Sequence, residues 1–262
     1  MKAIDADGAE ALPGRRLEAN ESFHFACRPD LACFNRCCRN LNLFLYPYDV
    51  LRLRRRLGVS AEQFLDDHTD LVLRPGHHFP DVLLRMTDNS EQTCPFVAAE
   101  GCTVYPDRPF TCRSFPLEKG LVFDAAGSRP KPAFFFNPPP FCLGPRQPHP
   151  ITAQDWFAEA DTGRYDRFTE RWAVIQDRFS RRNPWGAEGP QGQRAKMVFM
   201  AAYNLDAFRR FVFESSFLRR FKVPREQLRR MERNEEALLE LGLDWIERVL
   251  WGIQSPGLRP RR

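Results

Sequence analysis

Hydrophobic side chains recur with helical spacing in the last 110 residues of the chain. Successive spacings of four, three and four residues join Phe168, Trp172, Ile175 and Phe179. A second stripe of this kind consists of Ala201, Leu205, Phe208 and Val212. Such periods predict amphipathic helices, the second of them long and ending before Pro224, where a last helix starts. We interpret the stripes as core-packing faces, and a groove for a cofactor or partner is the alternative.

The first 150 residues carry shorter and more mixed patterns. Pro47 to Leu57, followed by Gly58, predicts a helix with a glycine cap, and Ser60 to Gln63 is a capping box for a second one. Brief apolar runs predict strands at residues 81–87, 102–105 and 121–123. Eight prolines in residues 129–150 exclude regular helix there and predict an extended connector.

These patterns predict an α+β fold that is predominantly helical. Residues 1–20 are expected to form a flexible tail, and residues 21–150 an irregular cysteine-rich domain with a few short strands. Residues 151–262 are expected to be an all-helical C-terminal region. No internal repeat is visible.

Composition and charge narrow the function classes. The hydrophobic fraction of 43% with 23 Phe predicts a globular protein. The net charge of +5 is spread along the chain, so nucleic-acid binding is not expected. The arginines within residues 52–56, 219–220 and 229–230 are interpreted as solvated helix faces, with a nucleic-acid or protein partner as the alternative.

The chain also carries no sign of a membrane or of export. No run of 18 apolar residues occurs, so no membrane span is expected. The first 20 residues lack the basic start and apolar stretch of a secretory signal. We therefore expect a cytoplasmic protein, in which thiols stay reduced.

Cysteine is the residue type with the most informative distribution. All eight cysteines precede residue 143: Cys27, Cys33, Cys37, Cys38, Cys94, Cys102, Cys112 and Cys142. Buried free thiols and disulfides are the alternatives, but polar neighbours and a reducing compartment favour metal ligation or redox chemistry. Thiolates are soft ligands that prefer zinc, Cu(I) and iron–sulfur clusters, and four of them fill a tetrahedral zinc site or hold one [4Fe-4S] cluster.

The spacing does not name the metal. It has neither the paired knuckles of a zinc finger nor the ferredoxin run. The adjacent Cys37 and Cys38 are poorly placed to bridge each other. They bind two different metals, or they are one ligand and its neighbour.

Charged residues and histidines near the cysteines have competing interpretations. Arg108 and Arg113 flank the later cysteines and would offset the negative charge of a thiolate cluster, or pair with Asp107 or Glu118 in a turn. The pair His77-His78 and the single His24 are interpreted as surface or turn residues. Neighbouring side chains of an extended segment point to opposite sides, which argues against the pair as joint ligands.

At these positions the chain resembles the YkgJ family of cysteine cluster proteins, also described as a zinc- or iron-chelating domain. The resemblance covers residues 23–145. It rests on Phe25-x-Cys27, Cys33-x3-Cys37-Cys38, Cys94-Pro-Phe, Gly101-Cys102-x-Val-Tyr105, Arg108-Pro109-x2-Cys112-Arg113-x-Phe115-Pro116 and the late Cys142. It implies chelation of zinc or iron, with the metal ion as partner and all eight cysteines as candidate ligands.

The resemblance leaves catalysis open. Flagellin lysine N-methylases look similar in their cysteine-cluster part, so a metal-cluster-dependent protein-modifying enzyme is the alternative function. No glycine-rich nucleotide loop supports a methyl-donor site, and no catalytic residue is assigned. A protein partner is open as well.

Overall fold

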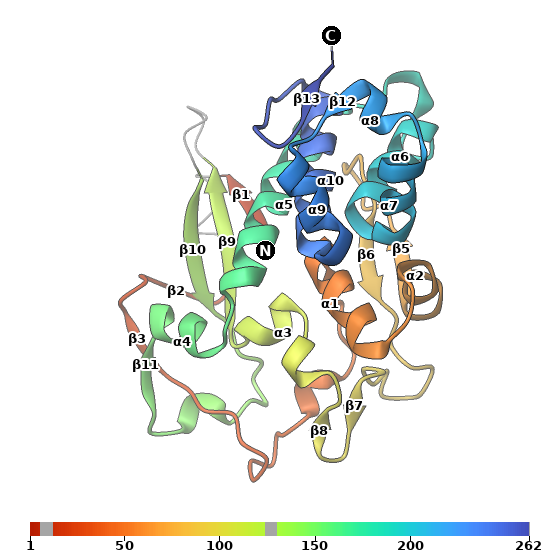
Figure 1. Cartoon of the computed structure of the whole chain (residues 1–262). Coiled ribbons are helices and arrows are strands. Elements are labelled where there is room, and N and C mark those ends of the chain that lie inside the picture. Colours follow the sequence, from red (N-terminus) through yellow and green to blue (C-terminus); the bar gives the residue numbers. More distant parts are fainter. Residues whose placement is uncertain (6–12, 124–129, 262) are drawn as a thin grey trace. The chain divides into compact units, whose positions relative to one another are not determined.

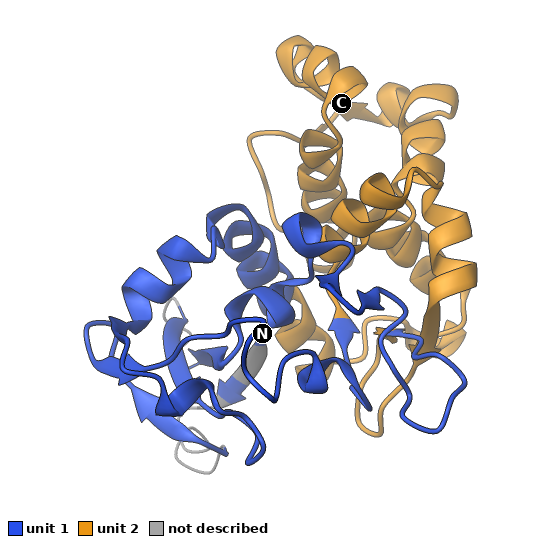
Figure 2. Cartoon of the chain, turned by 90° about the horizontal axis from the view of Figure 1, so that it is seen from below, with its two compact units in different colours: residues 1–44, 84–174 blue, residues 45–83, 175–262 orange. Residues whose placement is uncertain are grey.

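The computed structural model describes residues 1–5, 13–123 and 130–261, which form two compact units (Figure 2). Unit 1 contains residues 1–44 and 84–174, and unit 2 contains residues 45–83 and 175–262. The chain passes between them inside β4 (Phe44–Leu45), β6 (Asp81–Leu84) and α5 (Gly163–Arg181). All eight cysteines belong to unit 1, and residue 150, where a boundary was expected, lies inside that unit.

A four-stranded sheet organises unit 1 (Figure 1). Its strands are β1 (Lys2–Asp5), β2 (Arg15–Leu17), β9 (Leu117–Phe123) and β10 (Lys131–Phe136), in the order β1-β9-β10-β2. β1 runs parallel to β9, whereas the other pairs are antiparallel. Ile4, Ala133 and Phe135 form a small buried cluster on this sheet.

Two parts of this sheet differ from the sequence-based expectation. β1 and β2 lie in the region expected to be a flexible tail, of which residues 6–12 are outside the described ranges. β10 lies in the proline-rich stretch expected to be a connector. Pro132 pairs with Leu121 of β9 on one side. On its other side it has no strand partner among the described residues, because β2 pairs only with residues 134–136 of β10. A proline without a donor is tolerated at such an unpaired edge.

Helices of unit 1 pack beside the sheet through aromatic and charged contacts. α4 (Ala153–Glu159) starts after Thr152, whose hydroxyl accepts from the Asp155 N–H. The ring of Phe157 in α4 lies 5.2 Å from that of Phe134. Lys119 of β9 forms ion pairs with Asp166 at 2.6 Å and with Glu170 of α5.

The rest of unit 1 consists of short elements joined by turns. They are β3 (Ser22–His24), η2 (Arg36–Cys38), β7 (Val97–Ala98), β8 (Gly101–Cys102), η3 (Tyr105–Asp107), α3 (Phe110–Ser114), η4 (Gly144–Arg146) and β11 (Pro150–Thr152). The strand expected at residues 102–105 is wrong beyond Cys102, because Tyr105 starts a 3-10 turn. Pro106 in that turn has no N–H for a ladder.

Unit 2 begins with two helices that the sequence predicted. α1 (Pro47–Leu57) ends at Gly58, whose φ of 69° is the left-handed conformation that glycine adopts without strain. α2 (Ala61–His68) starts where the Ser60 hydroxyl accepts from the Gln63 N–H. The strand predicted at residues 81–87 is present as the shorter β6, which lies between β4 and β5 (Thr69–Val72).

The remaining elements of unit 2 are shorter and more numerous than predicted. They are η5 (Gly186–Glu188), α6 (Gln193–Tyr203), α7 (Leu205–Glu214), α8 (Phe217–Arg220), β12 (Phe221–Lys222), α9 (Arg225–Arg233), α10 (Glu235–Trp251) and β13 (Arg259–Pro260). Asn204 and Asn234 divide the two expected long helices, because each side-chain amide oxygen caps the helix that follows. β12 pairs with β13, so this region is not purely helical.

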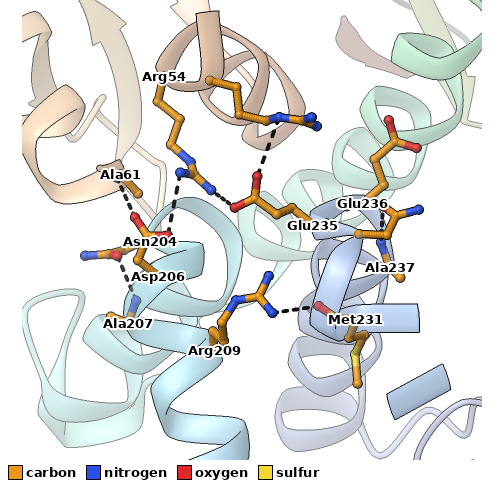
Figure 3. Close-up of polar contacts among 12 residues, drawn as sticks. Arg54, Ala61, Asn204, Asp206, Ala207, Arg209, Met231, Glu235, Glu236 and Ala237 are labelled. Atoms are coloured by element: carbon orange, nitrogen blue, oxygen red, sulfur yellow. Dashed lines mark hydrogen bonds and ion pairs between the residues drawn. The ribbon is translucent and has the colours of Figure 1, made fainter. Parts of the chain in front are cut away.

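The core of unit 2 is mostly apolar, and its buried polar residues within the described ranges are Asp49, Arg54, Thr69 and Asp81. Helix α10 buries six aliphatic side chains almost completely: Ala237, Leu238, Leu239, Leu241, Leu243 and Ile246. The Arg54 side chain is 8% exposed and forms ion pairs with Asp206 and Glu235 (Figure 3). Asp206 also accepts from the Ala61 N–H at 2.7 Å, so one carboxylate links the starts of α2 and α7 to α1.

The described residues contain ten α-helices and several mostly antiparallel short strands, which confirms a helix-rich α+β fold. The predicted stripe on α5 is buried throughout: Phe168, Trp172, Ile175 and Phe179. None of the described helices has the length and apolar character needed to cross a membrane.

Candidate metal centre

Cys27 is held close to the loop of Cys142 by backbone hydrogen bonds. β3 pairs with β11, and the buried Phe23 and Phe25 fix this segment against the ring of Trp156. Directly before Cys27, the Ala26 N–H donates to the carbonyl of Gly144 at 3.3 Å. The first and last cysteines of the sequence are therefore neighbours along paired backbone segments.

Cys33 contacts the same loop directly. It lies in a series of tight turns in which the Phe34 N–H donates to the Leu31 carbonyl at 2.8 Å. Its Sγ accepts a hydrogen bond from the Leu143 N–H at 3.3 Å, and it is the one cysteine of the eight that is fully buried. Hydrogen bonds to sulfur tune metal–thiolate sites, so Leu143 is a backbone contribution that the spacing of cysteines did not reveal.

The adjacent Cys37 and Cys38 lie on the 3-10 helix η2. Asn35 before it has a left-handed φ of 62°, which turns the chain sharply into η2. The carbonyl of Cys38 accepts from the Cys94 N–H at 2.8 Å, and Arg39 pairs with Thr93 in a β-bridge. The second cysteine segment is therefore joined to the first one at the vicinal pair.

The later cysteines lie on a small hairpin and a short helix. Cys102 in β8 pairs with Val97 in β7, and the Val97 N–H donates to the Cys94 carbonyl at 3.1 Å. The Asn35 side chain donates to the Ala98 carbonyl at 3.2 Å, which holds this hairpin beside η2. Cys112 follows in α3.

A known protein family matches this part of the chain. The family model CxxCxxCC, described as a "putative zinc- or iron-chelating domain", matches residues 26–142. Residues 26–142 are therefore similar to this zinc- or iron-chelating family. The resemblance to the cysteine cluster proteins is thereby confirmed, and the match includes all eight cysteines. Searches of curated proteins and of solved structures gave no match.

The thiols of the CxxCxxCC domain influence one another electrostatically. Desolvation, and then the neighbouring Cys37, Cys142 and Cys33, together raise the pKa of Cys27 to about 11, although the residue as a whole is exposed. Burial, then Cys33 and Cys37, raise the pKa of Cys142. Like charges at close range disfavour thiolates in this way, and a bound cation reverses the balance.

The other thiols show a second set of neighbours. A hydrogen bond from the Cys37 thiol to Cys38, and then burial, raise the pKa of Cys37. Burial raises the pKa of Cys94, with a further contribution from Cys102. Burial also raises the pKa of Cys102, which Arg108 opposes. None of the eight cysteines, all within the described ranges, is in a disulfide.

The two arginines that flank the later cysteines have different roles. Arg108 stacks on the ring of Tyr105 at 3.9 Å and interacts with the thiols of both Cys112 and Cys102. Its charge is therefore placed to offset thiolates. Arg113 is buried and donates to the carbonyls of Ala160 and Pro106 instead, which assigns it to packing.

A third arginine lies near the earlier cysteines. The Arg36 guanidinium lies 4.9 Å from the centre of the Phe141 ring, beside Cys142. The sequence offered Arg36 only as a polar neighbour of the cysteines, and an aromatic residue directly before Cys142 was the available signal for this contact.

Of the histidines considered as ligands, His77 and His78 lie outside the cysteine segments, whereas His24 lies close to Cys27 in sequence. His77 and His78 belong to unit 2, and burial and Arg74 lower the pKa of His77. His24 is exposed in β3. In the part of the chain that the structure describes, no three His, Cys, Asp or Glu side chains already stand in a metal-holding geometry.

Proposed function

We propose that the CxxCxxCC domain binds zinc or iron, the latter as free ion or as an iron–sulfur cluster, through its eight cysteines. One observation carries the proposal: three segments far apart in the sequence, residues 27–38, 94–112 and 142, are hydrogen-bonded together at their cysteines. Thiolates have the softness that zinc and iron–sulfur clusters require. Metal sites of this kind are completed by the metal itself, since binding and local ordering are coupled.

The donor set fits such a metal in number and charge. Four thiolates around Zn²⁺ carry a net charge of −2, and Arg108 and Arg36 supply positive charge next to cysteines. When bound, zinc would stabilise the irregular segments, and an iron–sulfur cluster would add redox chemistry.

Metal analysis of protein purified without oxygen tests the proposal. We expect bound zinc or iron, and visible absorption with acid-labile sulfide distinguishes a cluster from zinc. Protein that contains no metal and takes up neither Zn²⁺ nor Fe²⁺ with sulfide would sink the proposal. The double variant His77→Ala/His78→Ala is the matched control, and we expect it to keep its metal content.

The enzymatic alternative and the cytoplasmic location stay predictions. A lysine methylase resembling the flagellin enzymes must bind S-adenosylmethionine, so calorimetric titration of metal-loaded protein tests this alternative. Absence of heat and of competition by S-adenosylhomocysteine would count against it.

A further inference from the structure

The vicinal cysteines stand between two groups of thiols. Cys37 and Cys38 are consecutive residues of a 3-10 helix, where side chains are separated by about 120° around the axis. Consecutive side chains of η2 therefore start in different directions, although the thiols of Cys37 and Cys38 are hydrogen-bonded to each other. The question is which other cysteines each of them meets.

Contacts on one side join Cys37 to the earliest and the last cysteines. The loop of Cys142 touches Cys33 through the Leu143 N–H, and it reaches the residue before Cys27 through the Gly144 carbonyl. Arg36, next to Cys37, stacks on Phe141, next to Cys142. The electrostatic neighbours of the Cys27 thiol are the same three cysteines, Cys37, Cys142 and Cys33.

Contacts on the other side join Cys38 to the later cysteines. The Cys38 carbonyl accepts from the Cys94 N–H, and the thiols of Cys94 and Cys102 are electrostatic neighbours. Arg108 interacts with the thiols of both Cys102 and Cys112. The two groups meet at the hydrogen bond between the Cys37 and Cys38 side chains.

We propose that the eight cysteines form two separate four-thiolate metal sites, divided between Cys37 and Cys38. Site I consists of Cys27, Cys33, Cys37 and Cys142, and site II consists of Cys38, Cys94, Cys102 and Cys112. The inference rests on the proposed metal-binding function. Four thiolates complete a tetrahedral site, so eight supply two sites with no spare ligand and no open position.

The surroundings of the two sites predict a difference in metal exchange. Site I includes the exposed Cys27 and a loop of prolines, and its arginine, Arg36, is exposed. Site II is built on a hairpin and on α3, with Arg108 folded over Tyr105. Site I therefore loses metal to a chelator first.

Titration of reduced, metal-depleted protein with Co²⁺ and then Zn²⁺ tests the division. We expect two equivalents per chain, each with the intense sulfur-to-cobalt absorption of a thiolate site. One equivalent in the wild-type chain overturns the inference and leaves the proposed function standing. Failure to bind Co²⁺, Zn²⁺ and Fe²⁺ with sulfide alike overturns the proposed function itself.

Paired substitutions separate two independent sites from one shared cluster. Cys27→Ser/Cys142→Ser removes two ligands from site I, and we expect it to retain one equivalent. Cys27→Ser/Cys102→Ser removes one ligand from each site, and we expect affinity at both to fall at least tenfold. If the first pair weakens both sites equally, the division is wrong.

A measurement on the wild-type chain covers the case of variants that do not fold. Zinc-loaded protein is exposed to a chelator together with a thiol-alkylating reagent, and labelled cysteines are located by mass spectrometry. We expect the four cysteines of site I to be labelled together and first. Labelling that mixes members of the two groups overturns the assignment.

Discussion

The two units of the molecule are ordered by different kinds of interaction. Unit 2 buries aliphatic and aromatic side chains along its helices, and α10 alone contributes six that are at most 1% exposed. In the cysteine segments of unit 1, turns and backbone hydrogen bonds dominate, and Cys33 alone among the cysteines is buried. Apolar burial stabilises at about 25 cal/mol per Å², so unit 2 has a larger internal source of stability than these segments, which bury Phe96, Val104 and Phe110.

A metal ligand therefore matters more for the stability of the cysteine segments than for that of unit 2. A segment with little apolar burial must gain its ordering free energy from elsewhere, and metal–thiolate bonds supply it in small domains. We therefore expect substitutions and metal removal to act on the two units separately.

Metal removal should give the largest effect and should be confined to unit 1. Metal at about a thousand times its dissociation constant adds about 4 kcal/mol to the free energy of unfolding. Hydrogen exchange after chelation under reducing conditions should therefore show faster exchange around Cys33 and Cys94, whereas amides of α10 stay protected. Equal loss of protection in both units would break the comparison.

Gly242→Ala should destabilise unit 2 without touching the metal. A Cβ at Gly242 would lie 2.3 Å from the Ala201 carbonyl oxygen of α6, a backbone atom that cannot rotate away. Overpacking of this kind costs about 3 kcal/mol, the upper end of the usual range. Chemical denaturation measures the cost, and metal content should remain that of the wild type. Gly163→Ala is the control, because a Cβ there meets nothing within 4 Å.

Gly144→Ala should have a smaller cost and should affect the metal. The added Cβ would lie 2.3 Å from the Phe25 ring, which can shift, so we expect about 2 kcal/mol. The Gly144 carbonyl accepts from the residue before Cys27, and its loop carries Cys142. Metal affinity should therefore fall together with stability, which titration with Zn²⁺ measures. Unchanged affinity in a destabilised variant would mean that this loop does not position a ligand.

Much of the fold was predictable where local chemistry decided the structure. The start of α1 at Pro47 and its end before Gly58 follow from a proline and a glycine alone. The strand β10 was missed because its prolines argue against a sheet, and the reason that Pro132 is tolerated is an unpaired edge next to β9. Such an edge depends on the tertiary arrangement and has no sequence signal.

The sequence offers a set of candidate ligands for the site but not their arrangement. The spacing and neighbours of the cysteines indicated all eight as ligands, which stays a prediction. The sequence did not distinguish the roles of Arg108 and Arg113, whereas in the structure Arg113 donates to the carbonyl of Ala160 at the end of α4. The neighbours of Cys37 and Cys38 are set by hydrogen bonds that join residues 33–38 to the distant Cys94 and Leu143. A local sequence pattern does not predict such long-range hydrogen bonds.

Asn234→Ala should give the smallest effect and should be confined to unit 2. The Asn234 side chain accepts from the N–H groups of Glu236 at 2.9 Å and Ala237 at 3.4 Å, at the start of α10. Loss of such a cap costs about 1 kcal/mol. Asn234→Asp keeps an oxygen acceptor and adds a favourable charge at the helix N-terminus, so its stability should stay close to that of the wild type. If both variants are equally unstable, the break between α9 and α10 depends on something other than this cap. The aspartate variant is needed as a control because alanine, besides removing the cap, also favours one continuous helix across the position.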